Sequence, residues 1–202
     1  MGQYYNALVI DENGNAKVFH TVGMKLTEHS WIDNYSVNGV MKEIYNSPKR
    51  VAWIGDYANE PDDAFGDMTH EEYIKMYDLA WRTAEDKVEL FKADWCYDDE
   101  PLPSWFATQE EIDDLTTGTY LINHTFKIYM SFDEYKNEFK DNDWITHPLS
   151  LLTACGNGRG GGDFWNSNEG YRDVGSWAFC LIELSKKEPD GYMKDSYFFK
   201  EK

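Results

Sequence analysis

Residues 3–22, QYYNALVIDENGNAKVFHTV, contain the clearest structural pattern in the chain. Tyr4 to Ile10 is rich in aromatic and β-branched residues, which favour strands. Asp11 to Asn15 surrounds an Asn13-Gly14 pair, a dipeptide typical of tight hairpin turns. Ala16 to Val22 then returns to strand-forming residues. This stretch predicts a β-hairpin and therefore an antiparallel sheet.

Helix signals lie further along the chain. We expect a helix from Val37 to Tyr45 that Ser36 caps. The spacing of Thr69-x-x-Glu72, Thr108-x-x-Glu111 and Ser131-x-x-Glu134 is that of a capping box, in which two side chains satisfy the free N–H groups of a helix start. These three motifs predict helices over about residues 71–85, 109–115 and 132–140.

Strand signals separate these helices. RVAWIGDYA, residues 50–58, predicts a strand that ends near Gly55. Two short strands are expected on either side of His124-Thr125, and a closing hairpin is expected to turn at residues 188–191, EPDG. Strands at both ends with helices between them indicate an α+β fold with a mostly antiparallel sheet and three to four helices. The 202 residues fit a single domain, 1–202, in which about 59–114 is an acidic insertion.

The charge is concentrated in one part of the chain. The net charge is −18, and residues 56–114 hold 19 Asp or Glu against four Lys or Arg, a net of −15. Nucleic-acid and anionic-membrane binding both rely on Lys and Arg, so this composition argues against either partner. A basic protein partner would be attracted to the same segment.

A glycine-rich loop, GNGRGGGD at residues 156–163, is the strongest candidate site. Its spacing matches the dinucleotide fingerprint, but no helix is expected after it, so a Rossmann site is not predicted. The loop residues Gly156, Asn157, Gly158, Arg159, Gly160, Gly161, Gly162 and Asp163 allow three interpretations. They could form a nest of N–H groups for a phosphorylated ligand with Arg159 as a bidentate donor, a tight bend in which Arg159 pairs with Asp163, or a protein-contact loop.

Other polar residues give weaker signals. His29, Asp56 and His124 stand at expected strand ends or in connectors, and they could converge with Arg159 and Asp163. The histidines and cysteines lack the spacing of metal ligands, and no nucleophile-elbow motif occurs. We therefore expect no metal, no cofactor and a binding protein rather than an enzyme.

Several blocks together resemble a family of uncharacterised bacterial and prophage-type proteins. They are MGQYY, GMKLTEHSW, RVAWIGDYA, YLINHT, LLTACGNGRGGGDF and VGSWAF. The resemblance implies a cytoplasmic accessory protein that travels on mobile elements, with about 59–114 as its variable portion, and it implies no activity. Three cysteines without metal spacing, no apolar run of membrane length and no secretory signal agree with a cytoplasmic location.

Two hypotheses for function arise from these patterns. In the first, the acidic segment docks on a basic surface of a nucleic-acid-handling host protein and inhibits it by mimicking nucleic acid, as a counter-defence protein would. The partner-binding residues would be Asp62, Asp63, Asp67, Trp95, Asp98, Asp99, Glu100 and Trp105. In the alternative, loop 156–163, together with His29, Asp56 and His124, binds a nucleotide or a phosphorylated metabolite. The oligomeric state cannot be predicted from the sequence.

Overall fold

A computed structural model describes residues 1–21, 23–32, 34–60, 68–81, 108–140, 145–164 and 174–195. Within these ranges eight strands form one mixed, mostly antiparallel sheet. The strands are β1 (Tyr5–Ile10), β2 (Ala16–His20), β3 (Lys49–Gly55), β4 (Tyr120–Asn123), β5 (Ile128–Ser131), β6 (Ala154–Cys155), β7 (Leu181–Ser185) and β8 (Met193–Lys194). The α+β prediction with a mostly antiparallel sheet is confirmed.

The described residues form six helices, more than the three to four expected. They are α1 (Leu26–His29), α2 (Tyr35–Ile44), α3 (His70–Trp81), α4 (Gln109–Thr116), α5 (Phe132–Glu138) and α6 (Pro148–Leu152). The two helices without a sequence signal, α1 and α6, have only four and five residues. Helices this short show no full amphipathic repeat, which explains why the periodicity did not reveal them.

The sheet order is β2-β1-β3-β7-β4-β5-β8, and β6 also pairs with β3. One edge of β3 is shared between two strands. Its first residues pair antiparallel with β7, through Lys49 with Ile182, while Trp53 pairs in parallel with Ala154 of β6. The chain enters the glycine loop directly after β6, so the loop lies at the end of β3 that contains Gly55.

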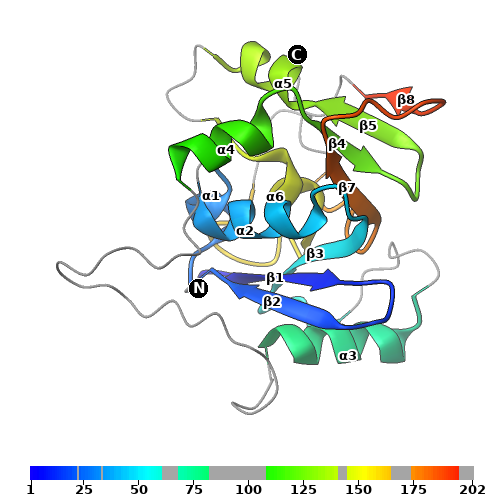
Figure 1. The fold of residues 1–202 in the computed structure, drawn as a ribbon. Helices are drawn as coiled ribbons and strands as arrows, with labels where there is room; N and C mark the ends of the chain where they lie inside the picture. Colours follow the sequence, from blue (N-terminus) through cyan, green and yellow to red (C-terminus); the bar gives the residue numbers. More distant parts are fainter. Residues whose placement is uncertain are drawn as a thin grey trace.

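Helices cover both faces of the sheet (Figure 1). Alternate residues of β1 contribute to two hydrophobic clusters, with Tyr5, Ala7 and Val9 on one face and Leu8 and Ile10 on the other. The first cluster includes side chains from α1, α2, α4, α5 and α6, and the second includes those of α3, which lies below β1 and β2 in the view. Because β1 is buried on both sides, its apolar run is nearly continuous.

The local signals located most elements correctly. The first hairpin forms as expected, and the Asp11 carboxylate accepts the N–H groups of Asn13 and Asn15 in its turn. Capping-box contacts occur at Thr69 and Thr108, and Ser131 caps α5. The N-cap of α2 is Asn34 rather than Ser36, because the Asn34 side chain accepts the N–H groups of Ser36 and Val37.

The predicted closing hairpin is wrong. β7 lies between β3 and β4, so both of its edges are occupied by other strands. β8 pairs instead in parallel with β5, through Ile128 with Met193 and Tyr129 with Lys194. The turn residues at 188–191 therefore begin a crossover past β4 and β5 and do not close a two-stranded ribbon.

Candidate functional site

The glycine loop forms a nest of N–H groups around a carboxylate of its own chain. Oδ2 of Asp163 accepts the main-chain N–H groups of Gly158, Arg159 and Gly160 at 2.7, 2.8 and 2.9 Å. Oδ1 of Asp163 accepts the Tyr5 hydroxyl at 2.9 Å. Asp163 is 3% exposed, so these four donors hold a buried carboxylate. Such a nest is an anion-binding arrangement, and here its anion is the side chain three to five residues further along.

The glycines also allow the chain near Gln3 to lie against the loop. A Cβ atom at Gly160 would stand 2.4 Å from the Cβ of Gln3, and one at Gly156 would stand 2.5 Å from the Cβ of Ala58. The main chains bond here as well, because the Gln3 N–H donates to the Gly161 carbonyl at 3.0 Å. Close backbone approach of this kind requires glycine.

Arg159 points away from the nest. Its guanidinium donates to the carbonyls of Tyr57 at 3.0 Å and Glu60 at 3.1 Å. The expected contact between Arg159 and Asp163 is therefore made by the Arg159 main chain, while the guanidinium holds the residues that follow β3. Asn157 closes the other side of the loop, since its side chain bonds both the N–H and the carbonyl of Phe164.

His29 lies beside the same core. Its Nδ1 donates to the Lys25 carbonyl at 2.6 Å, and its ring stacks on Trp53 with 6.4 Å between centroids. Burial lowers the pKa of His29 to about 4, so the ring is neutral at physiological pH. Burial, and then the Asp163 charge, raises the pKa of the neighbouring Tyr5 phenol.

Asp56 is close to the loop and His124 is not. The Asp56 carboxylate accepts the Tyr4 N–H at 3.1 Å beside the Gly55 end of β3. His124 donates its main-chain N–H to the Leu181 carbonyl, and Leu181 pairs with Arg50 near the start of β3. At strand spacing Arg50 lies roughly 16 Å from Gly55, the end of β3 beside the loop. His29, Asp56, Arg159 and Asp163 thus share one region, while His124 belongs to another.

His124 has its own polar partners. Its Nε2 lies 2.7 Å from Oε2 of Glu183, and its Nδ1 lies 2.9 Å from the Tyr192 hydroxyl. No sequence pattern singled out Glu183, Tyr192 or Tyr5. The alternation of β7 could have placed Glu183 toward solvent, but no local signal pairs Tyr5 with a residue 158 positions away.

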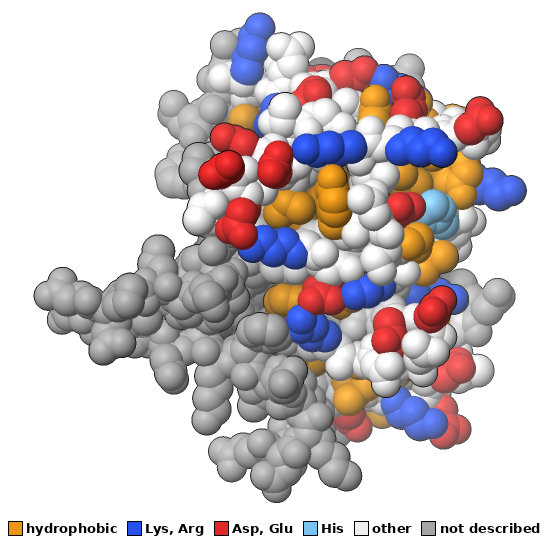
Figure 2. Space-filling view, viewed as in Figure 1, with side chains coloured by type: hydrophobic (Ala, Val, Ile, Leu, Met, Phe, Trp, Pro, Cys, Tyr) orange, Lys and Arg blue, Asp and Glu red, His pale blue; other side chains and the backbone are white. Residues whose placement is uncertain are grey.

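The predicted partner-binding residues lie outside the described residues. They are Asp62, Asp63, Asp67, Trp95, Asp98, Asp99, Glu100 and Trp105. The described parts of the acidic segment include α3 and α4, which pack against the two faces of the sheet. Figure 2 shows acidic side chains over α4 with lysines among them, and Glu111 pairs with Lys42 at 3.0 Å.

Aromatic side chains hold α3 against the end of β3. Tyr73, Tyr77 and Trp81, spaced four residues apart, donate to the carbonyls of Ala58 at 2.5 Å, Asp56 at 2.7 Å and Ile54 at 3.0 Å. Donors one helical turn apart thus reach alternate carbonyls, one in β3 and two in the turn that follows it. Trp81 is half-buried in this contact.

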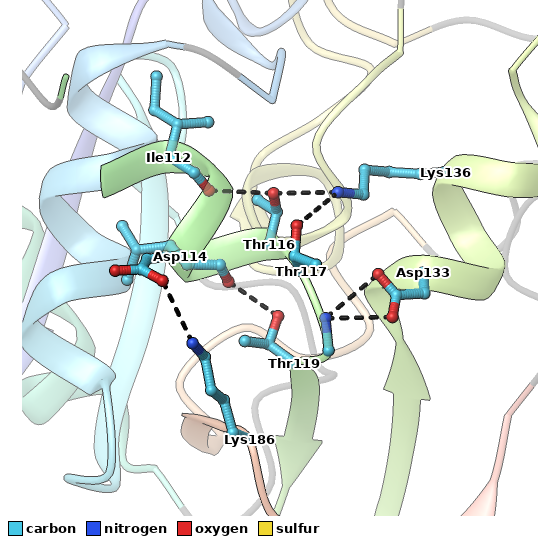
Figure 3. A network of polar contacts seen from close by, with 10 residues as sticks. Ile112, Asp114, Thr116, Thr117, Thr119, Asp133, Lys136 and Lys186 are labelled. Carbon is cyan, nitrogen blue, oxygen red and sulfur yellow. Dashed lines mark hydrogen bonds and ion pairs between the residues drawn. The ribbon is translucent and has the colours of Figure 1, made fainter. Parts of the chain in front are cut away.

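A polar network holds the end of α4 (Figure 3). Lys136 donates to the hydroxyls of Thr116 and Thr117, and the Asp133 carboxylate accepts the Gly118 N–H. Lys186 bonds Asp114 at 3.3 Å. Both described ends of the acidic segment are therefore fixed to the fold.

Comparisons with known proteins add no relative. No family model matches the chain, and no curated protein and no solved structure matches it significantly. Among the described residues, no group of three or more His, Cys, Asp or Glu is placed to hold a metal ion. No helix within the described ranges is long and apolar enough to cross a membrane.

Proposed function

We propose that this protein is a non-enzymatic, cytoplasmic binding protein of mobile-element type. Its acidic segment would dock on a basic, nucleic-acid-binding surface of a host protein and inhibit that protein by competing with nucleic acid. The observation that carries the proposal is the charge distribution. Residues 56–114 have a net charge of −15, whereas the other 143 residues hold 18 acidic and 15 basic side chains, a net of −3.

Carboxylates can compete with phosphates because both accept hydrogen bonds from Lys and Arg, and bidentate pairs with Arg are especially strong. A field concentrated in one segment also speeds association with a basic partner.

The hydrogen bonds of Asp163 make the alternative, a phosphorylated ligand in loop 156–163, less favourable. Three N–H groups that would bind a phosphate already bind Asp163. The guanidinium of Arg159 bonds two carbonyls of residues 57–60. A ligand in this loop would have to displace contacts that hold the sheet and loop together.

Capture from host lysate, followed by competition, tests the proposal. We expect the wild-type chain to capture a nucleic-acid-binding protein at low salt and duplex DNA to displace it. Replacing four acidic residues by lysine should weaken the binding at least tenfold; they are Asp62, Asp63, Asp98 and Asp99. The control variant carries four reversals outside the segment, at Glu12, Glu138, Asp190 and Glu201. Equal losses in both variants, or capture that DNA does not affect, would contradict the proposal.

A further inference from the structure

Glu183, His124 and Tyr192 form a chain of hydrogen bonds on the side of the sheet away from the glycine loop. Nε2 of His124 lies 2.7 Å from Oε2 of Glu183, and Nδ1 of His124 lies 2.9 Å from the Tyr192 hydroxyl. The side chains of His124 and Glu183 are 23% and 17% exposed, so solutes can reach this cluster. All three residues lie outside the acidic segment, so a reaction at this cluster would be a second activity, separate from the docking proposed above, which itself involves no catalysis.

The chemistry of the partners fixes the direction of these hydrogen bonds. An ionised carboxylate only accepts, so Nε2 of His124 carries the hydrogen that faces Glu183. In the neutral ring Nδ1 then has a lone pair, and the Tyr192 hydroxyl donates to it. A hydroxyl that donates to an imidazole, itself oriented by a carboxylate, is the arrangement that activates a nucleophile in covalent catalysis.

Two of the most exposed apolar side chains are close to this cluster in the sequence. Phe126 is 56% exposed and follows His124 by two residues, while Met193 is 65% exposed and follows Tyr192 directly. The Met193 N–H donates to the Lys127 carbonyl at 2.9 Å, which joins the two segments. A ligand with an aromatic or aliphatic group that binds where these two segments meet would therefore lie near Tyr192.

We propose that Glu183, His124 and Tyr192 are a proton relay that makes the Tyr192 oxygen a nucleophile toward small acyl or sulfonyl donors with an apolar group. In the step, the Tyr192 oxygen bonds to the acyl carbon or the sulfonyl sulfur. The phenolic proton passes to Nδ1 of His124, and the bond to the leaving group breaks. His124 then returns the proton to the leaving group, and Glu183 acts as a positioning residue that keeps the ring in the reactive tautomer.

Phenylmethanesulfonyl fluoride is a suitable probe, because its aryl group is apolar and fluoride is the leaving group. The rate of modification of each tyrosine is measured by peptide mass spectrometry on the full chain. Tyr4 serves as an internal control, since it is 38% exposed. A positioned base typically contributes 10²–10⁴-fold. We expect Tyr192 to react at least tenfold faster than Tyr4.

Two variants test the relay. His124→Gln keeps a side chain that can bond both neighbours but cannot take the proton, so Tyr192 should react about as slowly as Tyr4. Glu183→Gln should lower the Tyr192 rate at least fivefold. The Tyr4 rate and the thermal midpoint show whether either variant disturbs the fold. The inference is overturned if wild-type Tyr192 reacts no faster than Tyr4, or if His124→Gln leaves the ratio of the two rates unchanged.

Discussion

Replacing Asp163 by alanine tests the structural role of the glycine loop, because this carboxylate holds the loop and β1 together. The change leaves four donors without an acceptor, namely three loop N–H groups and the Tyr5 hydroxyl. Tyr5 is fully buried, so leaving its hydroxyl without an acceptor should lower the free energy of unfolding by about 1–3 kcal/mol. Water partly reaches the loop N–H groups, so the loss of each of their hydrogen bonds should cost about 1 kcal/mol of stability. The expected destabilisation is about 4–6 kcal/mol.

The assay is equilibrium unfolding in urea, which gives the free energy of unfolding for each variant. Asp163→Asn keeps one oxygen for the N–H groups and loses only the charge, so about 1–3 kcal/mol is expected. Tyr5→Phe should cost about 1–2 kcal/mol, and less in the Asp163→Ala background, where the hydroxyl has already lost its partner. Glu138→Ala, on the exposed face of α5, controls for removing one negative charge from a chain of net charge −18.

The structural role assigned to Asp163 fails if Asp163→Ala costs less than about 1 kcal/mol, the contribution of a single hydrogen bond. It also fails if phosphate or nucleotides raise the thermal midpoint of the wild-type chain, because a ligand that binds the folded state must stabilise it. That second result would mean that Asp163 leaves the nest and that loop 156–163 binds an anion.

Three further predictions concern packing and pH. Gly160→Ala should destabilise the protein by at least about 2 kcal/mol in urea unfolding, since its Cβ would overlap Gln3. A Cβ at Gly158 meets open space, so the control Gly158→Ala should cost only the strain of its φ of 95°. Tyr77→Phe should cost about 1 kcal/mol and speed hydrogen exchange in α3, because the Asp56 carbonyl loses its donor. Burial lowers the pKa of His29 from 6.5 to about 4, so below pH 6.5 the unfolded chain binds a proton that the folded chain does not. This residue should therefore lower the free energy of unfolding by about 3 kcal/mol between pH 6.5 and 4. His29→Phe should remove that part of the fall, and an unchanged pH profile of stability in this variant would contradict the burial of His29.

Local signals located the elements well because the interactions behind them are local. The Asn13-Gly14 turn and the boxes at Thr69 and Thr108 involve residues no more than four positions apart, and each forms as expected. The cap of α2 was misassigned by two residues, since Asn34 and Ser36 are both good N-cap residues and only the backbone geometry distinguishes them.

The pairing of strands that are distant in the chain could not be predicted from the sequence. Nothing near Met193 indicates that its strand pairs with β5 rather than β7, because that choice depends on β7 being enclosed by β3 and β4. The four-residue spacing of Tyr73, Tyr77 and Trp81 can be read from the sequence, but the carbonyls that they bond belong to residues 54–58 and required the fold.

The candidate site was predicted in part. The glycine spacing indicated a nest of N–H groups, and the nest is present. Its occupant, Asp163, was within the quoted motif, yet the spacing of the glycines alone does not distinguish an internal carboxylate from a bound phosphate. The role of Arg159 depends on residues 57–60, about 100 positions earlier, so it required the fold.

The salt dependence of partner binding tests the proposed function most directly. The captured host protein would be titrated with the wild-type chain and with the variant carrying lysine at Asp62, Asp63, Asp98 and Asp99. We predict that wild-type affinity falls steeply and linearly on a plot of log K against log salt concentration, and that the slope is much shallower for the variant. An affinity that does not change with salt, or equal slopes for the two proteins, would contradict the claim that the acidic segment carries the interaction.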